Sequence, residues 1–215
     1  MHVFAISIST LLFGKLGKSA LIAYISLLFV IANIFVIKQI TLFGWSVTSA
    51  DAFIVGISFG INLLQEFYGK ESAKKAIWIS FACSIFYMII SQCVLAYIPA
   101  EFDDSHIQFS HIMAYTIRIT LASFTAYLIT QFTDMQLYGL IKKITNGKYF
   151  VLRNYFTLCT SQLIDTILFS FLGLYGIVDN IYHIMTVSYA IKIIAIVMTT
   201  PFLIVAKKII APKKV

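Results

Sequence analysis

The sequence predicts an all-α polytopic membrane protein, a bundle of about six transmembrane helices forming a single domain over residues 1–215. Of its 215 residues 60% are hydrophobic and 12% are charged, whereas soluble domains are nearer half apolar and a quarter charged. A helix needs roughly 20 apolar residues to cross a hydrocarbon core of about 30 Å. Segments of this kind follow one another with short connections at 19–37, 49–68, 75–98, 113–140, 152–175 and 184–206.

The N-terminal stretch, residues 1–13, is apolar but too short to span a bilayer. It lacks the small-x-small site at which signal peptides are cleaved. We therefore expect this stretch to remain attached and to lie along the membrane interface or to cap the bundle.

The basic residues predict how the bundle is oriented. The net charge is +7, and thirteen of the 16 Lys and Arg residues fall on one side of the predicted spans: Lys15, Lys18, Lys70, Lys74, Lys75, Lys142, Lys143, Lys148, Arg153, Lys207, Lys208, Lys213 and Lys214. The opposite loops hold Lys38 with the acidic residues Glu101, Asp103, Asp104 and Asp179. Because cytoplasmic loops collect Lys and Arg, we expect a multi-pass inner-membrane protein with both termini in the cytoplasm. The basicity reflects topology and does not indicate a nucleic-acid partner.

Enzyme motifs do not fit their required context. Gly56-Ile57-Ser58-Phe59-Gly60 matches the G-x-S-x-G pattern of serine hydrolases, but that chemistry needs a sharp turn and a histidine base beside the serine. Ser58 lies inside a predicted helix, so we interpret Gly56 and Gly60 as a small-residue packing face. No G-x-x-x-x-G-K-[ST] loop occurs, and the three cysteines lack the spacing of metal ligands. We predict no enzyme, no metal site and no cofactor.

Charged side chains inside the predicted spans cost about 2.5–3.5 kcal/mol each at the bilayer centre, so each needs a partner or a function. We single out five of the charged residues in the spans: Glu66, Arg118, Asp134, Asp165 and Lys192. At about 100° per residue, the polar residues of four spans fall on one stripe of each helix. Lipid cannot solvate these stripes, so we expect them to face a shared, hydrated cavity. We assign to substrate binding Asn62, Glu66, Ser123, Tyr127, Gln131, Asp134, Asn154, Ser161, Gln162, Asp165 and Lys192.

A structural interpretation is open for the same residues. Asp165 and Lys192 lie at similar predicted depth, and a buried ion pair between them would serve only to hold the bundle together. Arg118 lies about 24 Å along the helix axis from Asp134 and on a different face, so these two cannot pair. We expect Arg118 to anchor another helix near the outer face.

At these positions the sequence resembles the queuosine-precursor transporter family, from about Lys18 to Lys208. The matching stretches are Ala32-Asn33, Glu66-Phe67-Tyr68-Gly69-Lys70, Arg118 to Tyr127, Gln131, Asp134, Arg153-Asn154, Ser161 to Thr166, Lys192 and Thr200-Pro201. Two positions depart from the family's pattern. Asn62 stands where many relatives carry Asp, and Thr157-Leu158 stands where a Ser-Thr pair is common. Both departures leave the exact substrate open.

The resemblance implies uptake of a small nucleobase, a 7-deazaguanine such as 7-cyano-7-deazaguanine, 7-aminomethyl-7-deazaguanine or queuine, which cells salvage for tRNA modification. Such a base presents adjacent N–H donors that a carboxylate can accept as a pair. Amide side chains suit its other edges, and Tyr127 or Phe169 suits its ring face. Three forms of the protein remain open. The first is a complete carrier, alone or as a homo-oligomer. The others are a substrate-binding subunit served by separate ATPases and a structural subunit of a membrane complex.

Overall fold

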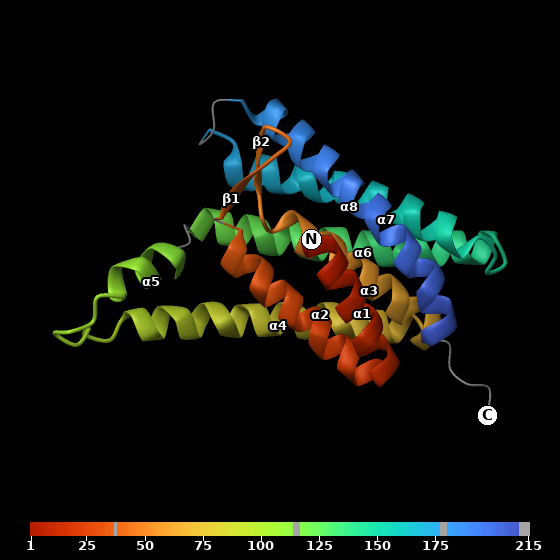
Figure 1. The fold of residues 1–215 in the computed structure, drawn as a ribbon, viewed down its shortest axis with the longest axis horizontal. Coiled ribbons are helices and arrows are strands. Elements are labelled where there is room, and N and C mark those ends of the chain that lie inside the picture. The colour runs from red at the N-terminus through yellow and green to blue at the C-terminus, as the bar shows by residue number, and fades with distance from the viewer. Residues whose placement is uncertain (37, 114–116, 177–179, 211–215) are drawn as a thin grey trace.

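Helices dominate the chain, and the predicted all-α membrane fold class is confirmed. The computed structural model describes residues 1–36, 38–113, 117–176 and 180–210. Figure 1 shows the elements within these residues, which are α1 (His2–Leu16), α2 (Lys18–Phe35), β1 (Gln39–Leu42), β2 (Trp45–Thr48), α3 (Asp51–Tyr68), α4 (Lys70–Leu95), α5 (His106–Met113), α6 (Ile117–Ile144), α7 (Phe150–Phe169), the π-helical turn η1 (Ser170–Leu174) and α8 (Ile181–Ile209).

Each predicted span coincides with a helix, with ends that differ by a few residues. In chain order the six spans correspond to α2, α3, α4, α6, α7 continued by η1, and α8. At the fourth span the helix α6 is preceded by α5, and the two are bent by 48° relative to each other. The short helix α5 was not predicted. Residues 37 and 114–116, which fall inside two predicted spans, lie outside the described residues.

Four helices of the described chain are long and apolar enough to cross a membrane by themselves: α2, α4, α7 with η1, and α8. A fifth is reached when α5 and α6 are taken as one broken span. α3 is not among them, and its 18 residues include Asp51, Asn62, Gln65 and Glu66. A count of six spans therefore stays a prediction, and it depends on whether protein rather than lipid surrounds α3.

Protein does surround α3. This helix contacts α1, α2, α4, α6, α7 and α8, and every residue from Val55 to Gln65 is buried. Two glycines make the close approach possible. A Cβ at Gly56 would overlap Ile6 of α1, and one at Gly60 would come within 2.9 Å of Ile25 of α2. Gly56 and Gly60 thus form the small-residue packing face that the sequence predicts.

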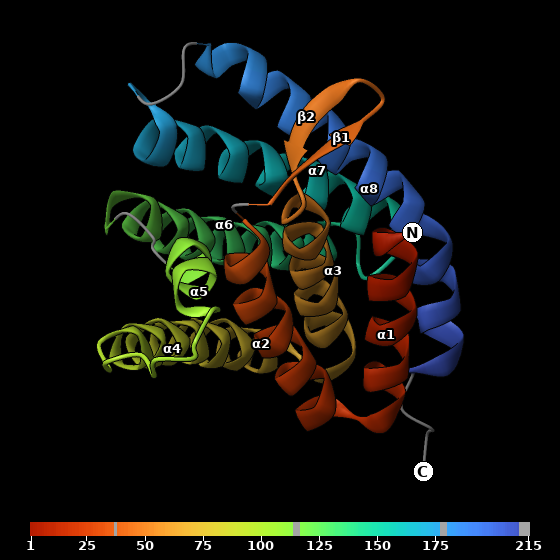
Figure 2. The same ribbon diagram turned by 60° about the vertical axis from the view of Figure 1, so that its left-hand side comes forward.

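α1 runs alongside α3 in the same direction and also packs on α8 (Figure 2). The ring of His2 lies 5.4 Å from the ring of Phe53, and the carbonyl of Gly14 accepts a hydrogen bond of 3.5 Å from the Tyr68 hydroxyl. The expectation that this stretch lies along the interface or caps the bundle is therefore wrong. The glycine face of α3 explains the difference, because its missing side chains let α1 pack closely along α3.

The basic connections gather at one end of the bundle, which we call the basic end. Lys142 lies 2.8 Å from Glu66, which joins the end of α6 to the end of α3. The side chain of Ile210, just after α8, contacts Gly14 near the α1–α2 turn. The hairpin β1–β2, α5 and η1 lie at the opposite end, which we call the outer end because the predicted orientation places it outside the cytoplasm (Figure 1). Lys213, Lys214 and Asp179 lie outside the described residues.

The two ends of the described chain do not lie together. α8 ends at the basic end, whereas α1 starts beside Phe53 and only reaches that end at Lys15. The location of both termini in the cytoplasm stays a prediction. Lys15 and Lys18 flank a turn between two antiparallel helices. Their charges therefore indicate the side of that turn and not the side of the first residue.

Candidate functional site

A cavity of about 410 Å³ lies toward the outer end, between α2, α3, α6, α7 and α8. Its apolar wall carries aromatic side chains from three helices, Phe29, Tyr127 and Phe169. The hairpin β1–β2 contributes Gln39, Val47 and Thr48 at the outer end of the cavity. Such a volume is in the range of pockets that hold one small organic molecule.

Three charged side chains from three helices meet in the wall of this cavity. Lys192 of α8 donates a hydrogen bond of 2.7 Å to Asp165 of α7, and its Nζ lies 3.7 Å from the carboxylate of Asp51 of α3. Ser188 donates to both oxygens of Asp51, at 3.2 and 3.1 Å. All three charged residues are buried, with 4% of Asp51, 8% of Asp165 and 3% of Lys192 exposed. The site therefore holds one carboxylate more than it holds cations.

The predicted pair of Asp165 and Lys192 is therefore present, but it is part of a trio. Asp51 was missed, because it lies at the first residue of α3, where an acidic side chain is ordinarily explained by the helix dipole. The signal that would have found it is angular. Eleven residues separate Asp51 from Asn62, which at about 100° per residue places both on one stripe.

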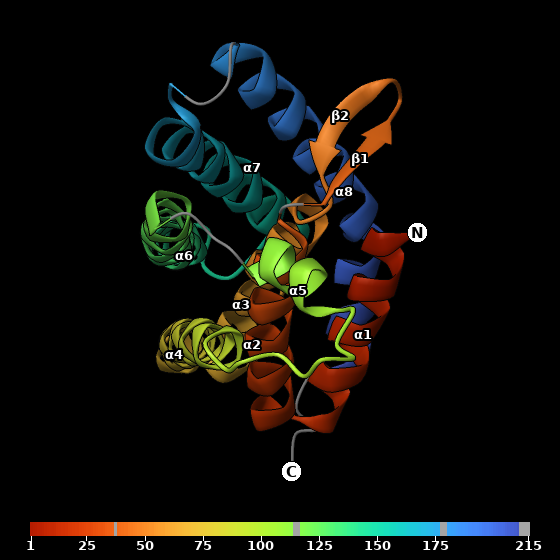
Figure 3. The same ribbon diagram turned by 90° about the vertical axis from the view of Figure 1, so that its left-hand side faces the viewer.

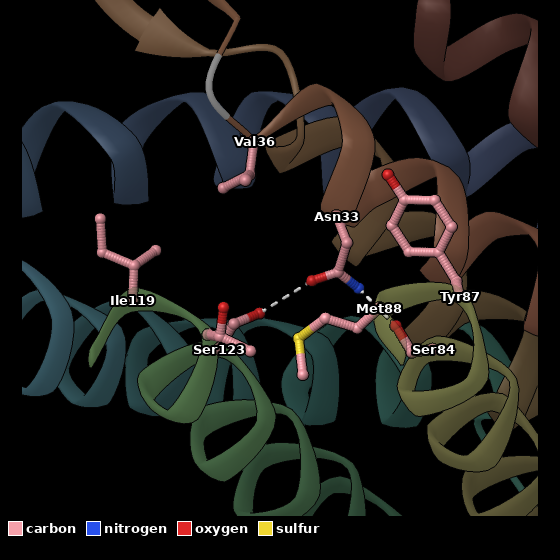
Figure 4. A pocket seen from close by; sticks show the side chains of 8 residues that line it. Asn33, Val36, Ser84, Tyr87, Met88, Ile119 and Ser123 are labelled. Atoms are coloured by element: carbon pink, nitrogen blue, oxygen red, sulfur yellow. Dashed lines mark hydrogen bonds between the residues drawn. The ribbon is translucent and has the colours of Figure 1, made fainter. Parts of the chain in front are cut away.

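The α2 side of the cavity is held by an amide. Asn33 donates a hydrogen bond of 2.7 Å to Ser84 of α4 and accepts one of 3.3 Å from Ser123 of α6 (Figure 4). One turn away, the ring of Tyr127 stacks on Phe29 with centroids 3.7 Å apart. Of the eleven predicted site residues, those that line the cavity are Ser123, Tyr127, Asp165 and Lys192.

The other seven predicted residues lie between the cavity and the basic end, where α3, α6 and α7 face one another. We call these seven side chains, together with the residues of α3, α6 and α7 that bond to them, the polar column. Its first layer is a trio in which Ser58 and Gln131 exchange hydrogen bonds of 3.0 and 3.2 Å and Gln162 donates to Ser58 at 3.1 Å. All three side chains are fully buried.

The second layer lies about one helical turn further toward the basic end. Asn62 donates to Asn154 at 3.5 Å and to Thr157 at 3.3 Å, which ties α3 to α7. Asp134 of α6 is fully buried and faces Asn62, Thr157 and Ser161. Neither of its carboxylate oxygens meets a donor with hydrogen-bond geometry within the described residues.

The third layer closes the column at the basic end. Glu66 accepts from Arg153 at 2.7 Å and from Tyr138 at 3.0 Å, and it lies 2.8 Å from Lys142. The Arg153 side chain is completely buried and also donates to the carbonyl of Lys148 at 3.2 Å. The polar stripes of α3, α6 and α7 thus face one another as the sequence predicts, but only their outer part borders the cavity.

Arg118 has the anchoring contacts expected of it. Its Nε donates to the carbonyl of Leu172 at 2.9 Å, and one Nη donates to the carbonyl of Tyr175 at 2.6 Å. These bonds fasten α6 to η1 and the residue that follows it. Because Leu174 borders the cavity, Arg118 supports the cavity wall without lining it.

The arrangement can bind and enclose a small polar solute between helices, with a route of buried polar groups leading to the far end. Figure 3 views the bundle from the outer end and shows α3 between α1 and α2 on one side and α6 and α7 on the other. These features are typical of a membrane transporter.

Comparison with known proteins identifies the family. A model of the family described as "putative vitamin uptake transporter" matches residues 49–206, and the chain belongs to this family. The chain is 34% identical over 208 residues to the protein named "Probable queuosine precursor transporter" of Bacillus subtilis (strain 168), which covers 94% of this chain and 90% of that protein. No solved structure matches the chain. The resemblance noted from the sequence motifs is confirmed.

Proposed function

We propose that this chain is a carrier that takes up queuosine precursors or queuine, 7-deazaguanine bases that are salvaged for tRNA modification. The observation that carries the proposal is the buried trio of Asp51, Asp165 and Lys192 in the wall of the cavity, with one carboxylate more than cations. The similarity to the Bacillus subtilis protein supports the choice of substrate class.

The cavity suits a planar base with several hydrogen-bonding edges. A deazaguanine carries adjacent N–H donors, and a carboxylate accepts two parallel N–H bonds with charge-assisted strength. Asp165 and Asp51 are the acceptors we assign to this edge. Tyr127 and Phe29 offer a ring face in the same cavity. The aminomethyl form, a cation, would also match the additional carboxylate.

The test is transport by the purified chain alone in liposomes. We expect exchange of labelled 7-cyano-7-deazaguanine across the bilayer, with the aminomethyl form and queuine compared as competitors. A chain that exchanges none of the three despite correct insertion would contradict the proposal. Transport only after separate ATPases are added would favour a substrate-binding subunit instead, and no binding in either case would favour a structural subunit.

Replacing Asp165 by Asn should leave the fold intact and weaken substrate binding roughly ten- to hundredfold. Charge-assisted hydrogen bonds contribute about 1.5–3 kcal/mol, which corresponds to that range of Kd. The fold is spared because Asp51 remains as counter-ion to Lys192, so that the trio becomes a matched pair. Asp103→Asn, in an exposed outer loop, is the matched control. Unchanged Kd in the folded Asp165→Asn protein would remove Asp165 from the site.

We propose further that six helices span the inner membrane and that the basic end faces the cytoplasm. A cysteine placed at Asp104 should react with an impermeant reagent added outside intact cells, and one placed at Lys143 should react only after the cells are opened. Labelling of both positions from the same side would show that the assignment of spans is wrong. Asp104 and Lys143 are both exposed, so folding should tolerate either change.

A further inference from the structure

Asp134 has surroundings unlike those of every other carboxylate in the polar column and the cavity wall. Glu66 lies between Arg153 and Lys142, and Asp51 and Asp165 share Lys192. Asp134 is fully buried, and no cation of the described residues lies within ion-pair distance of it. A buried charge without partner is strongly unfavourable, so the group is expected to be held neutral.

The hydrogen-bond donors around Asp134 are already used elsewhere. The hydroxyl of Thr157 donates to the carbonyl of Asn154 at 3.1 Å, and that of Ser161 donates to the carbonyl of Leu158 at 3.2 Å. The amide nitrogen of Asn62 donates toward α7. The carbonyl oxygen of Asn62, by contrast, accepts no hydrogen bond within the described residues. Every donor that faces Asp134 thus has another acceptor, and the carbonyl oxygen of Asn62 suits a protonated carboxyl with its own O–H.

The titratable groups that adjoin this layer lie about one turn away on each helix. Toward the basic end they are Glu66 of α3, Tyr138 of α6 and Arg153 of α7, which bond to one another. Toward the cavity the next one is Asp165, which bonds to Lys192. The Ser58–Gln131–Gln162 layer separates Asp134 from the cavity. Asp134 is thus close to the substrate pocket without belonging to it.

We propose that Asp134 is a proton-binding site that couples transport to the proton gradient. This inference rests on the proposed function. A proton from the outer side adds to a carboxylate oxygen of Asp134, is carried while the substrate crosses, and leaves to water at the basic end. No other bond forms or breaks. A neutral base cannot be accumulated by the membrane potential alone, so a bound proton supplies the driving force that the solute itself lacks.

Loss of the proton has a direct effect on helix contacts. A carboxylate at position 134 needs donors, and the nearest are the amide of Asn62 and the hydroxyls of Thr157 and Ser161, which Asp134 faces. Recruiting the Asn62 amide would draw it away from Asn154 and Thr157, to which it donates in the present arrangement. Proton binding at α6 is in this way linked to the hydrogen bonds between α3 and α7.

The experiment uses liposomes that contain the full chain, a medium more acidic than the lumen, and labelled 7-cyano-7-deazaguanine. With one proton per solute, one pH unit of gradient drives up to about tenfold accumulation. We expect this in the wild type and its abolition by a protonophore. In Asp134→Asn, accumulation should fall to an inside-to-outside ratio near one, while exchange without a gradient and the melting temperature stay close to wild type. Asp103→Asn should behave as wild type.

Several outcomes would overturn the proposal. Undiminished accumulation by folded Asp134→Asn would show that the proton binds elsewhere, and loss of exchange together with accumulation would place Asp134 in substrate binding. If Asp134→Asn does not fold, the test uses Asp134→Glu and the wild type. In these proteins substrate entry must raise the pH of the weakly buffered medium, which an indicator dye reads. If the wild type exchanges substrate but does not respond to the gradient, only the proposal of proton coupling is contradicted. Absence of wild-type exchange sinks the proposed function itself.

Discussion

Lys192→Met is expected to abolish transport and to remove much of the stability of the protein. The change leaves Asp51 and Asp165 side by side in a buried wall, with two negative charges and no cation. Removing one partner of a buried ion pair typically costs about 3–5 kcal/mol, against a total stability of about 5–15 kcal/mol for a folded domain. Thermal unfolding in detergent and exchange in liposomes are the measurements. Lys148→Met, which removes an exposed cation from the α6–α7 connection, is the control.

Restoring the charge balance separates the two roles of the trio. The triple variant Lys192→Met, Asp165→Asn, Asp51→Asn carries no charge at the site and should recover most of the lost stability. If the carboxylates bind substrate, this variant stays inactive although it folds. Recovery of both stability and transport would show that the trio only holds α3, α7 and α8 together.

Glu66→Gln is the second substitution with a large expected effect. Glu66 is the carboxylate partner of Arg153, whose side chain is completely buried, so the change strands a buried guanidinium at a cost of about 3–5 kcal/mol. Lys142 contributes less to this balance, because it is 36% exposed and its charge is screened by water. A lowered melting temperature is the expected result.

Two further variants test this interpretation of the third layer. Glu66→Gln combined with Arg153→Met removes both charges and should melt closer to wild type than Glu66→Gln alone. Glu71→Gln, an exposed carboxylate at the same end of the bundle, should melt as wild type. A Glu66→Gln protein with unchanged stability would mean that Tyr138 and the Lys148 carbonyl are sufficient to hold Arg153.

The sequence predicts the helices well because lipid permits few alternatives. Apolar segments of about 20 residues must be helical, and polar residues on one stripe must face protein. Gln131, Asp134, Asn154 and Gln162 all obey this rule. Angular position, however, says little about depth relative to neighbouring helices. The same stripe therefore places Tyr127 at the cavity and Asp134 in the closed column.

The features that the sequence analysis missed have weaker signals. The hairpin β1–β2 is short, and its two-residue turn places Phe43 and Gly44 at positive φ, 53° and 82°. Hairpin turns of this type usually contain Asn-Gly or Asp-Gly, so Phe43-Gly44 does not predict a hairpin. The position of α1 inside the bundle depends on the shape of the glycine face of α3, which the residues of α1 alone do not indicate.

The central helix α3 has two unlike sides, and this decides where the bundle can part. On one side Gly56 and Gly60 admit the side chains of α1 and α2, and opening that apolar interface would leave voids or expose tightly packed surface. On the other side α3 meets α6 and α7 through amides, hydroxyls and charges, which water can replace at a modest net cost of about 0.5–1.5 kcal/mol for each hydrogen bond. We therefore expect any separation of helices to follow the polar column, with α1, α2 and α3 moving as one body.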